Sequence, residues 1–297
     1  VEAETDEYGA YTLENLPDDE WEITVAAGDR VVFPASRTVT VSGANLTQVN
    51  FVAVVRGRCV LLLHLNTDFT DSSPSGHTVS VHGDAAISTD QKKFGAGSCV
   101  LDGTGDYLSV PDAGDWDLGD FTIDAWIRPD TITSCQRIAG AGTWAHGPAA
   151  MWFFGIGTVW GGGTKLNFGY GWGPGYTEVN SNAISVATET WYHVAVVRSG
   201  ATVYFFLNGT AVGSGNLGST QIRSGSGPLV GARYESLSVV EVFDGYIDEL
   251  RISKLARWTE DFTPETSEYE PDAEIYVIEG TILDGSSNPV PGVLITA

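Results

Sequence analysis

The chain has 297 residues, a length that suits one large β domain and one smaller domain. Its 36 Gly, 12 Pro and 11% aromatic residues favour short strands joined by tight turns. The 38 acidic residues outnumber the 15 basic ones, and the formal net charge of −23 repels nucleic acid and anionic membrane surfaces. We therefore expect no nucleic acid partner, and no membrane insertion because the longest apolar runs are far too short to span a bilayer.

The first segment, residues 1–53, predicts short strands separated by turns. It holds two basic residues, Arg30 and Arg37, and no lysine. Turn-forming sequences lie at 7–9 and 15–20, and apolar residues alternate with polar ones between them. This composition sets the segment apart from the longer stretch that follows.

Residues 54–263 form the large body of the chain. From Phe121 to Arg128 the apolar residues recur at period two, so Phe121, Ile123, Ala125 and Ile127 share one face of a strand. Further strands are predicted at 191–198 and 201–207. The Asn208-Gly209 pair that follows is a strong signal for a two-residue hairpin turn. Strands this dense, with Gly-rich turns, predict an all-β fold with a large antiparallel jelly-roll sandwich.

The body is followed by an acidic segment. Residues 259–274 carry seven acidic residues, two prolines and no basic residue, which predicts an extended linker at 264–274. Residues 275–297 then become apolar and strand-like again.

The two ends of the chain form one continuous β module when residues 275–297 are joined to residues 1–53. The joined sequence has a recognisable pattern at Gly280, Ile282, Asp284, Pro289, Gly292 and Val293, followed by Thr5, Asp6, Gly9, Tyr11, Leu13, Asn15, Leu16 and Pro17. Through these residues it resembles a carboxypeptidase regulatory-like domain, the small prealbumin-like or collagen-binding-B-type β-sandwich of surface proteins.

A sandwich split in this way leaves each half with unpaired edges and bare apolar faces, which are costly. We expect residues 275–297 of one unit to complete residues 1–53 of the next copy, head to tail, through covalent tandem repeats or through strand donation between subunits. The alternative is that the two ends dock on each other within one chain. The predicted interface residues are Gly280, Ile282, Val293 and Ile295 on one side and Tyr11, Leu13 and Ile23 on the other.

The body contains a series of motifs at 61–66, 71–77, 93–95, 101–110, 121–126, 191–195, 207–209 and 245–252. Through these motifs it resembles a laminin-G-like, concanavalin A-like jelly roll, a module of bacterial surface proteins, phage structural proteins and sugar-binding proteins. It departs from the family at 140–180, which is unusually rich in Gly and Trp.

This resemblance implies a structural calcium ion between Asp71 and Asp248. Carbonyl groups of Gly76 and His77 would complete its shell, and Asp68 is a further candidate, because calcium prefers oxygen ligands. The alternative is that Asp71 caps a turn through its side chain and Asp248 faces solvent.

The Trp-rich stretch offers a candidate binding face. Trp144, Trp160, Trp172 and Tyr176 could stack on sugar rings or contact a protein partner, and the alternative is that these rings belong to the sandwich core. Asn45 and Asn208 each begin a sequon and are candidate glycosylation sites.

Three cysteines, at 59, 99 and 135, leave the redox compartment open: Cys59 and Cys99 could pair, or all three could be free thiols.

These features favour a non-catalytic structural repeat or subunit of a filament, placed outside the cell, on the cell surface or on a virion. The alternative is a carbohydrate-binding adhesin module with glycan partners. A glycoside hydrolase is a further alternative, but the E-x-D-x-x-E strand of related glucanases is absent from the sequence. We therefore expect no enzymatic activity.

Overall fold

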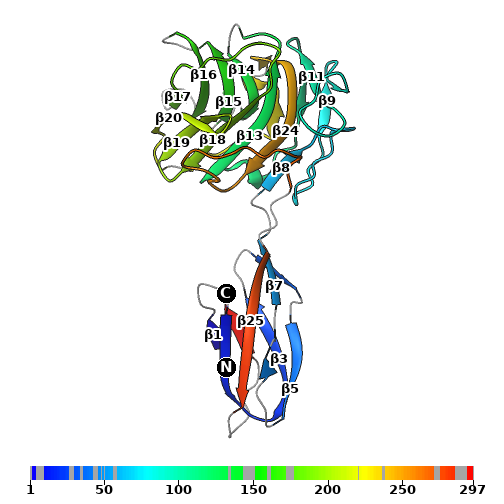
Figure 1. Ribbon diagram of the computed structural model, residues 1–297, viewed down its shortest axis with the longest axis vertical. Helices are drawn as coiled ribbons and strands as arrows, with labels where there is room; N and C mark the ends of the chain where they lie inside the picture. Colours follow the sequence, from blue (N-terminus) through cyan, green and yellow to red (C-terminus); the bar gives the residue numbers. More distant parts are fainter. Residues whose placement is uncertain are drawn as a thin grey trace. The chain divides into compact units, whose positions relative to one another are not determined.

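The computed structural model divides the chain into two compact units, Val1–Arg56 with Asp272–Ala297, and Gly57–Pro271 (Figure 1). The structure describes residues 2–4, 10–26, 30–33, 36–42, 46–47, 49, 51–55, 59–132, 135–142, 151–158, 162–171, 177–219, 221–235, 238–270, 275–284 and 293–296. In these residues the only helical segment is the short 3-10 turn Gly114–Trp116, so the predicted all-β class is confirmed.

The small unit contains two sheets. The first has the strand order β1-β26-β3-β5, and the second has the order β2-β25-β7-β4, with β6 also pairing with β25. Its strands are β1 (Glu2–Glu4), β2 (Ala10–Leu16), β3 (Asp19–Ala26), β4 (Arg30–Phe33), β5 (Ser36–Val41), β6 (Leu46–Thr47), β7 (Phe51–Val55), β25 (Ile275–Asp284) and β26 (Val293–Thr296).

The small unit is completed by the chain's own ends. The predicted interface residues are register partners, since Tyr11 lies opposite Gly280, Leu13 opposite Ile282, and Ile23 opposite Val293. Ile295 of β26 pairs with both β1 and β3. The sequence predicts that a neighbouring unit supplies these strands. In the structure β25 and β26 pair with β2 and β3 of the same chain, and completion by a neighbouring unit stays a prediction.

Buried side chains of the small unit come from both of its sheets. Tyr11 and Leu13 of β2 and Trp21 and Ile23 of β3 are almost fully buried. The Tyr11 hydroxyl donates to the carbonyl of Val49 at 2.7 Å, which gives this buried polar atom a partner. The resemblance of this unit to a prealbumin-like family stays a prediction.

The large unit contains the other strands of the chain. They are β8 (Cys59–Leu63), β9 (Ser80–His82), β10 (Ala86–Ser88), β11 (Ser98–Asp102), β12 (Tyr107–Ser109), β13 (Phe121–Pro129), β14 (Gln136–Ala141), β15 (Met151–Thr158), β16 (Thr164–Gly171), β17 (Thr177–Asn180), β18 (Tyr192–Ser199), β19 (Thr202–Leu207), β20 (Thr210–Asn216), β21 (Pro228–Val230), β22 (Arg233–Glu235), β23 (Ser238–Val240) and β24 (Asp244–Ser253).

Two antiparallel sheets form the sandwich of the large unit (Figure 1). The eight-stranded sheet has the order β10-β11-β24-β13-β18-β19-β20, with β8 also pairing with β24. The seven-stranded sheet has the order β17-β16-β15-β14-β21-β12-β9, and β22 and β23 form a separate hairpin.

The core lies between the two sheets and follows the predicted alternation. Phe121, Ile123, Ala125 and Ile127 are all fully buried in it, as their spacing predicts. The predicted hairpin turn joins β19 to β20, and both of its central residues have positive φ, 51° at Asn208 and 77° at Gly209.

The segment after β24 packs back on the jelly roll. We call residues 254–270 the C-terminal strap. Trp258 and Phe262 stack on each other with centroids 3.8 Å apart, and Phe262 also contacts Phe206 of β19. Tyr269 is buried with Leu62 in a cluster on the outer face of the eight-stranded sheet.

The strap corrects the predicted linker at 264–274, because residues 264–270 belong to the large unit, which the prediction ended at 263. Two acidic residues of the strap hydrogen-bond to other residues of the large unit while their side chains stay partly exposed. Glu265 accepts from Arg251 at 3.1 Å, and Glu268 accepts from Asn66 at 2.7 Å. Composition alone could not show this, since the partners of the strap are distant in sequence.

Candidate functional site

The outer face of the seven-stranded sheet, which points away from the core, is polar. Along β15, Trp152, Phe154 and Ile156 enter the core, so Phe153 and Gly155 face outward. Their register partners on β16, Gly169 and Asn167, therefore share this outer face.

A hydrogen-bonded network of charged side chains crosses this face. The carboxylate of Glu241 accepts from Arg137 Nε at 2.5 Å and from Arg233 Nε at 2.5 Å. Arg137 Nη1 also donates to Asn167 Oδ1 at 2.9 Å. Asn167 in turn donates to Glu178 at 3.4 Å. Four elements thus contribute to one network: β14, β16, β17 and the hairpin of β22 and β23.

Glycine and aromatic residues of the sheet hold Arg137 in place. Its guanidinium lies 3.7 Å from the centroid of the Phe153 ring, which is a close cation–π contact. A Cβ on Gly155 would meet Arg137 Cδ and Nη1 at 3.0 Å, so only glycine leaves room for this side chain to cross the strand. The network is therefore built into the sheet and does not depend on flexible surface side chains.

The two arginines set the charge state of the network. Burial raises the pKa of Glu241, but hydrogen bonds and charge from Arg233 and Arg137 outweigh burial and hold this pKa below its usual range. Glu241 is thus an ionised acceptor at neutral pH, and its side chain is still 27% exposed.

Aromatic rings lie at the other edge of the same sheet. His82 of β9 and Tyr107 of β12 stack with ring centroids 4.3 Å apart and an interplanar angle of 6°. His82 Nε2 lies 2.8 Å from the Ser109 hydroxyl. Burial raises the pKa of Tyr234 on β22, and the nearby Tyr107 raises it further by its charge when ionised. Tyr234 is therefore a neutral phenol at neutral pH. His82, Tyr107 and Tyr234 are all partly exposed.

We call this combined surface the outer face site: the rings of His82, Tyr107 and Tyr234 together with the network of Arg137, Arg233 and Glu241. It combines flat apolar rings with fixed donors and acceptors. Such a combination suits a ligand that has both C–H faces and hydroxyl groups.

The candidate aromatic residues Trp144, Trp160, Trp172 and Tyr176 lie outside the described residues. In sequence they fall between β14 and β15, between β15 and β16, and between β16 and β17. Their role as a glycan or partner face stays a prediction.

The predicted calcium residues are only partly brought together. Asp71, Gly76 and His77 line one pocket of about 360 Å³, but Asp248 is not part of its lining. β8 separates the two aspartates, since Leu63 bridges Asp71 on one side and pairs with Leu250 of β24 on the other. Asp68 is exposed and accepts from the Thr70 amide at 2.8 Å, which lowers its pKa.

Asp71 uses its carboxylate to hold its own loop. Its oxygens accept hydrogen bonds from the amides of Leu62, Ser73 and His77 at 2.7–2.9 Å. Amide protons pointing at both oxygens fit a turn cap and do not fit a cation site. The described residues contain no group of three or more His, Cys, Asp or Glu that could hold a metal ion. Calcium binding stays a prediction.

The remaining predicted residues are placed as follows. No disulfide joins Cys59 to Cys99 in the structure. Asn208 is exposed in its hairpin turn, and Asn45 lies outside the described residues.

Sequence reasoning missed Arg137, Arg233 and Glu241. One signal was available, because Arg137 directly precedes a run of apolar and small residues, Ile138 to Gly142. Its partner Glu241 is 104 positions away, which no local pattern reveals.

A family model described as the concanavalin A-like lectin/glucanases superfamily matches residues 102–261. Among solved structures, domain 4 of AbnA, a GH43 extracellular arabinanase from Geobacillus stearothermophilus, in complex with arabinotriose, is 21% identical. That match covers 68% of this chain and 94% of that domain, with a TM-score of 0.52.

Two further solved structures are similar in part. The CBM40 of the Ruminococcus gnavus IT-sialidase bound to α2,3-sialyllactose is 14% identical, with a TM-score of 0.42, over 48% of this chain and 79% of that one. The binding domain of botulinum neurotoxin DC in complex with SialylT is 13% identical, with a TM-score of 0.49. That match covers 67% of this chain and 48% of the neurotoxin chain. No curated protein matches the chain. No helix among the described residues is long and apolar enough to cross a membrane.

Proposed function

Because this chain belongs to the concanavalin A-like lectin/glucanases superfamily, we propose that it is a non-catalytic carbohydrate-binding protein that acts outside the cell. The observation that carries the proposal is the outer face site, where the stacked rings of His82 and Tyr107 lie on the same sheet as the Arg137–Glu241–Arg233 network.

Each part of the outer face site suits one part of a sugar. Aromatic faces stack on the C–H faces of pyranose or furanose rings. The ionised and partly exposed Glu241 accepts hydrogen bonds from sugar hydroxyls, while the buried Arg137 guanidinium holds Glu241 in place. Because Phe153 and Gly155 fix the network before any ligand arrives, little side-chain entropy is lost on binding.

The charge state of Glu241 supports a binding role over a hydrolytic one. A glycosidase needs a carboxylic acid with a raised pKa that protonates the leaving group, and a second carboxylate beside it. Glu241 has a lowered pKa and is bound by two arginines, so it holds no proton to donate at neutral pH.

The small unit gives less support to the head-to-tail filament that the sequence predicts. Its strands β25 and β26 are paired within the chain, so the assembly contact inferred from unpaired edges is not required.

Binding to a glycan array, followed by calorimetry with the best ligand, tests the proposal. AbnA domain 4 was solved with arabinotriose, so arabino-oligosaccharides are the first ligands to include. We expect Tyr107→Ala and Tyr234→Ala each to weaken binding about tenfold, the value of a lost aromatic stacking contact.

Tyr246→Ala is the matched control, because Tyr246 is a partly exposed tyrosine on β24 of the eight-stranded sheet. No binding to any glycan would refute the function. Glycan binding that is equally weakened by the control would refute the site.

A further inference from the structure

A second groove lies on the outer face of the eight-stranded sheet, beneath the C-terminal strap. The strap is anchored by Trp258 and Phe262 at one end and by Tyr269 at the other. Between these anchors it lines a groove of about 320 Å³. The lining residues are Lys93, Phe94, Trp126, Asn208, Thr263, Pro264, Glu265 and Thr266.

The floor of this groove holds an indole N–H without a partner. Trp126 is 8% exposed, and its Nε1 has no hydrogen-bond partner among the described residues. Phe94 packs on Trp126 edge to face with centroids 5.7 Å apart, and Pro264 lines the strap side. Because that nitrogen has almost no accessible surface, the indole offers the groove its ring and not its N–H.

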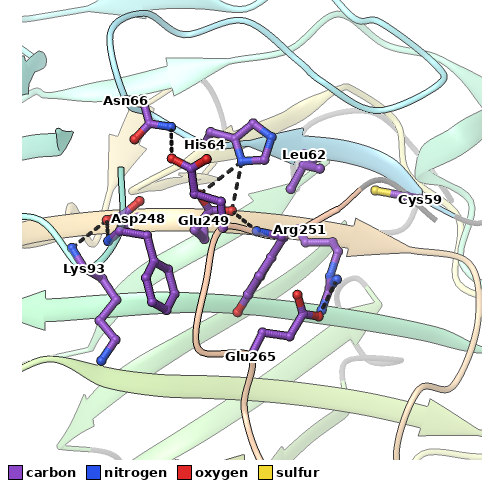
Figure 2. Close-up of polar contacts among 12 residues, drawn as sticks. Cys59, Leu62, His64, Asn66, Lys93, Asp248, Glu249, Arg251 and Glu265 are labelled. Atoms are coloured by element: carbon purple, nitrogen blue, oxygen red, sulfur yellow. Dashed lines mark hydrogen bonds and ion pairs between the residues drawn. The ribbon is translucent and has the colours of Figure 1, made fainter. Parts of the chain in front are cut away.

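Lys93 brings a positive charge to the same place. Its ammonium lies 3.8 Å from the centroid of the Trp126 ring and forms no ion pair with any described residue. The backbone amide of Lys93 donates to Asp248 Oδ2 at 2.7 Å, and Figure 2 shows the ammonium at the opposite end of the residue, pointing away from Asp248.

Glu265, the acidic residue of the groove lining, does not pair with Lys93. Glu265 is bound by Arg251 Nη1 at 3.1 Å, as Figure 2 shows. The groove therefore offers an ammonium at Lys93, a side-chain amide at Asn208, and hydroxyls at Thr263 and Thr266. Apolar rings lie beside these polar groups. In a chain with a net charge of −23, a cation with no acidic partner is an informative feature.

We propose that this groove binds one sugar ring that carries a carboxylate, of the hexuronic acid class. The carboxylate pairs with the Lys93 ammonium, the ring packs against Phe94 and Pro264, and ring hydroxyls bond to Asn208. A groove of this volume holds one such ring. The groove lies on the other sheet from the outer face site, so the inference stands independently of the proposed function.

Titration of the full chain with D-glucuronate, followed by the indole ¹H–¹⁵N signals in NMR spectra, tests the inference. Trp126→Phe assigns the signal of Trp126, since this signal alone is lost. We expect that signal to shift saturably, because the ligand pairs with the ammonium that lies on the Trp126 ring, and D-glucose to leave it in place.

Lys93→Gln should weaken glucuronate binding about tenfold or more, the usual value of a charged hydrogen bond. Lys92→Gln is the matched control, because it removes the same charge one residue away, outside the groove lining. An indole signal that does not move, an equal response to D-glucose, or equal effects of the two lysine variants would overturn the inference. The Tyr107→Ala variant tests glycan binding at the outer face site and should leave the Trp126 signal unchanged. Failure of the groove proposal can therefore be distinguished from failure of the proposed function.

Discussion

Replacing Arg251 by Met tests whether a buried ion pair fixes the strap to the jelly roll. Arg251 of β24 and Asp124 of β13 are register partners, and both are almost fully buried. Arg251 Nε donates to Asp124 Oδ1 at 3.1 Å, and Nη2 donates to Oδ2 at 2.9 Å. Its guanidinium also lies 4.1 Å from the centroid of Tyr269 in the strap.

The expected loss of stability is large. Arg251→Met leaves Asp124 buried, with His193 Nε2 3.5 Å away as its remaining ionic contact. Removing one partner of a buried pair costs about 3–5 kcal/mol. For a unit of this size that loss lowers Tm by roughly 6–20 °C. Replacing both partners, as Asp124→Leu with Arg251→Met, should restore most of the stability, because no charge is then left buried without a partner.

The loss should also depend on pH. Burial raises the pKa of Asp124, but the charge of Arg251 outweighs burial and holds this pKa well below its usual range. A depressed pKa contributes stability above the ordinary pKa of Asp, about 3.9, and the contribution is lost as pH falls through the folded value.

Urea unfolding of the wild type and Arg251→Met should therefore differ most at pH 7 and less near pH 4, where the variant's Asp124 takes up a proton. A loss below about 1 kcal/mol at pH 7, or a double variant no more stable than the single one, would refute this reasoning.

Three further predictions concern loops and titrating groups. In urea unfolding, Gly209→Ala should destabilise the large unit several-fold more than Gly105→Ala. The two glycines have similar φ, 77° and 79°, so the backbone strain is the same, but an added Cβ meets the strap only at Gly209. Burial raises the pKa of Asp248 to about 7, and Glu249 raises that of His64. Both contributions to stability are therefore lost as pH rises through the folded pKa values, and Asp248→Asn should flatten the change in unfolding free energy between pH 5 and 8. If the carboxylate of Asp71 serves only as a turn cap, calcium leaves Tm unchanged, whereas a rise in Tm that Asp71→Asn abolishes would support the calcium site that the sequence predicts.

Local patterns predicted the fold of the jelly roll because its strands alternate clearly. The burial of Phe121, Ile123, Ala125 and Ile127 follows directly from period two, and the turn at Asn208-Gly209 needs only its own positive φ. These features depend on neighbours in the sequence, so they can be recognised without tertiary contacts.

The network and the strap could not be predicted in the same way. Glu241 meets Arg137 across 104 positions, and Glu249 meets His64 across 185, so neither pairing leaves a local signal. The acidic composition of residues 264–270 favoured a solvated linker, but burial of Tyr269 and the ion pair of Glu265 hold these residues on the sheet. Tertiary pairing overrides composition here.

The ends of the chain show a third kind of limit. Their sequence correctly indicated that residues 275–297 pair with residues 1–53, since unpaired strand edges require partners. It could not decide between pairing within one chain and pairing between copies, because both satisfy the same hydrogen bonds.

Backbone amide NMR spectra of the full chain, titrated with the best glycan from the array, test the central proposal most directly. The account predicts shifts concentrated on the seven-stranded sheet and its hairpin, around His82, Tyr107, Arg137 and Tyr234. Shifts confined to other surfaces, or none at saturating glycan, would contradict it.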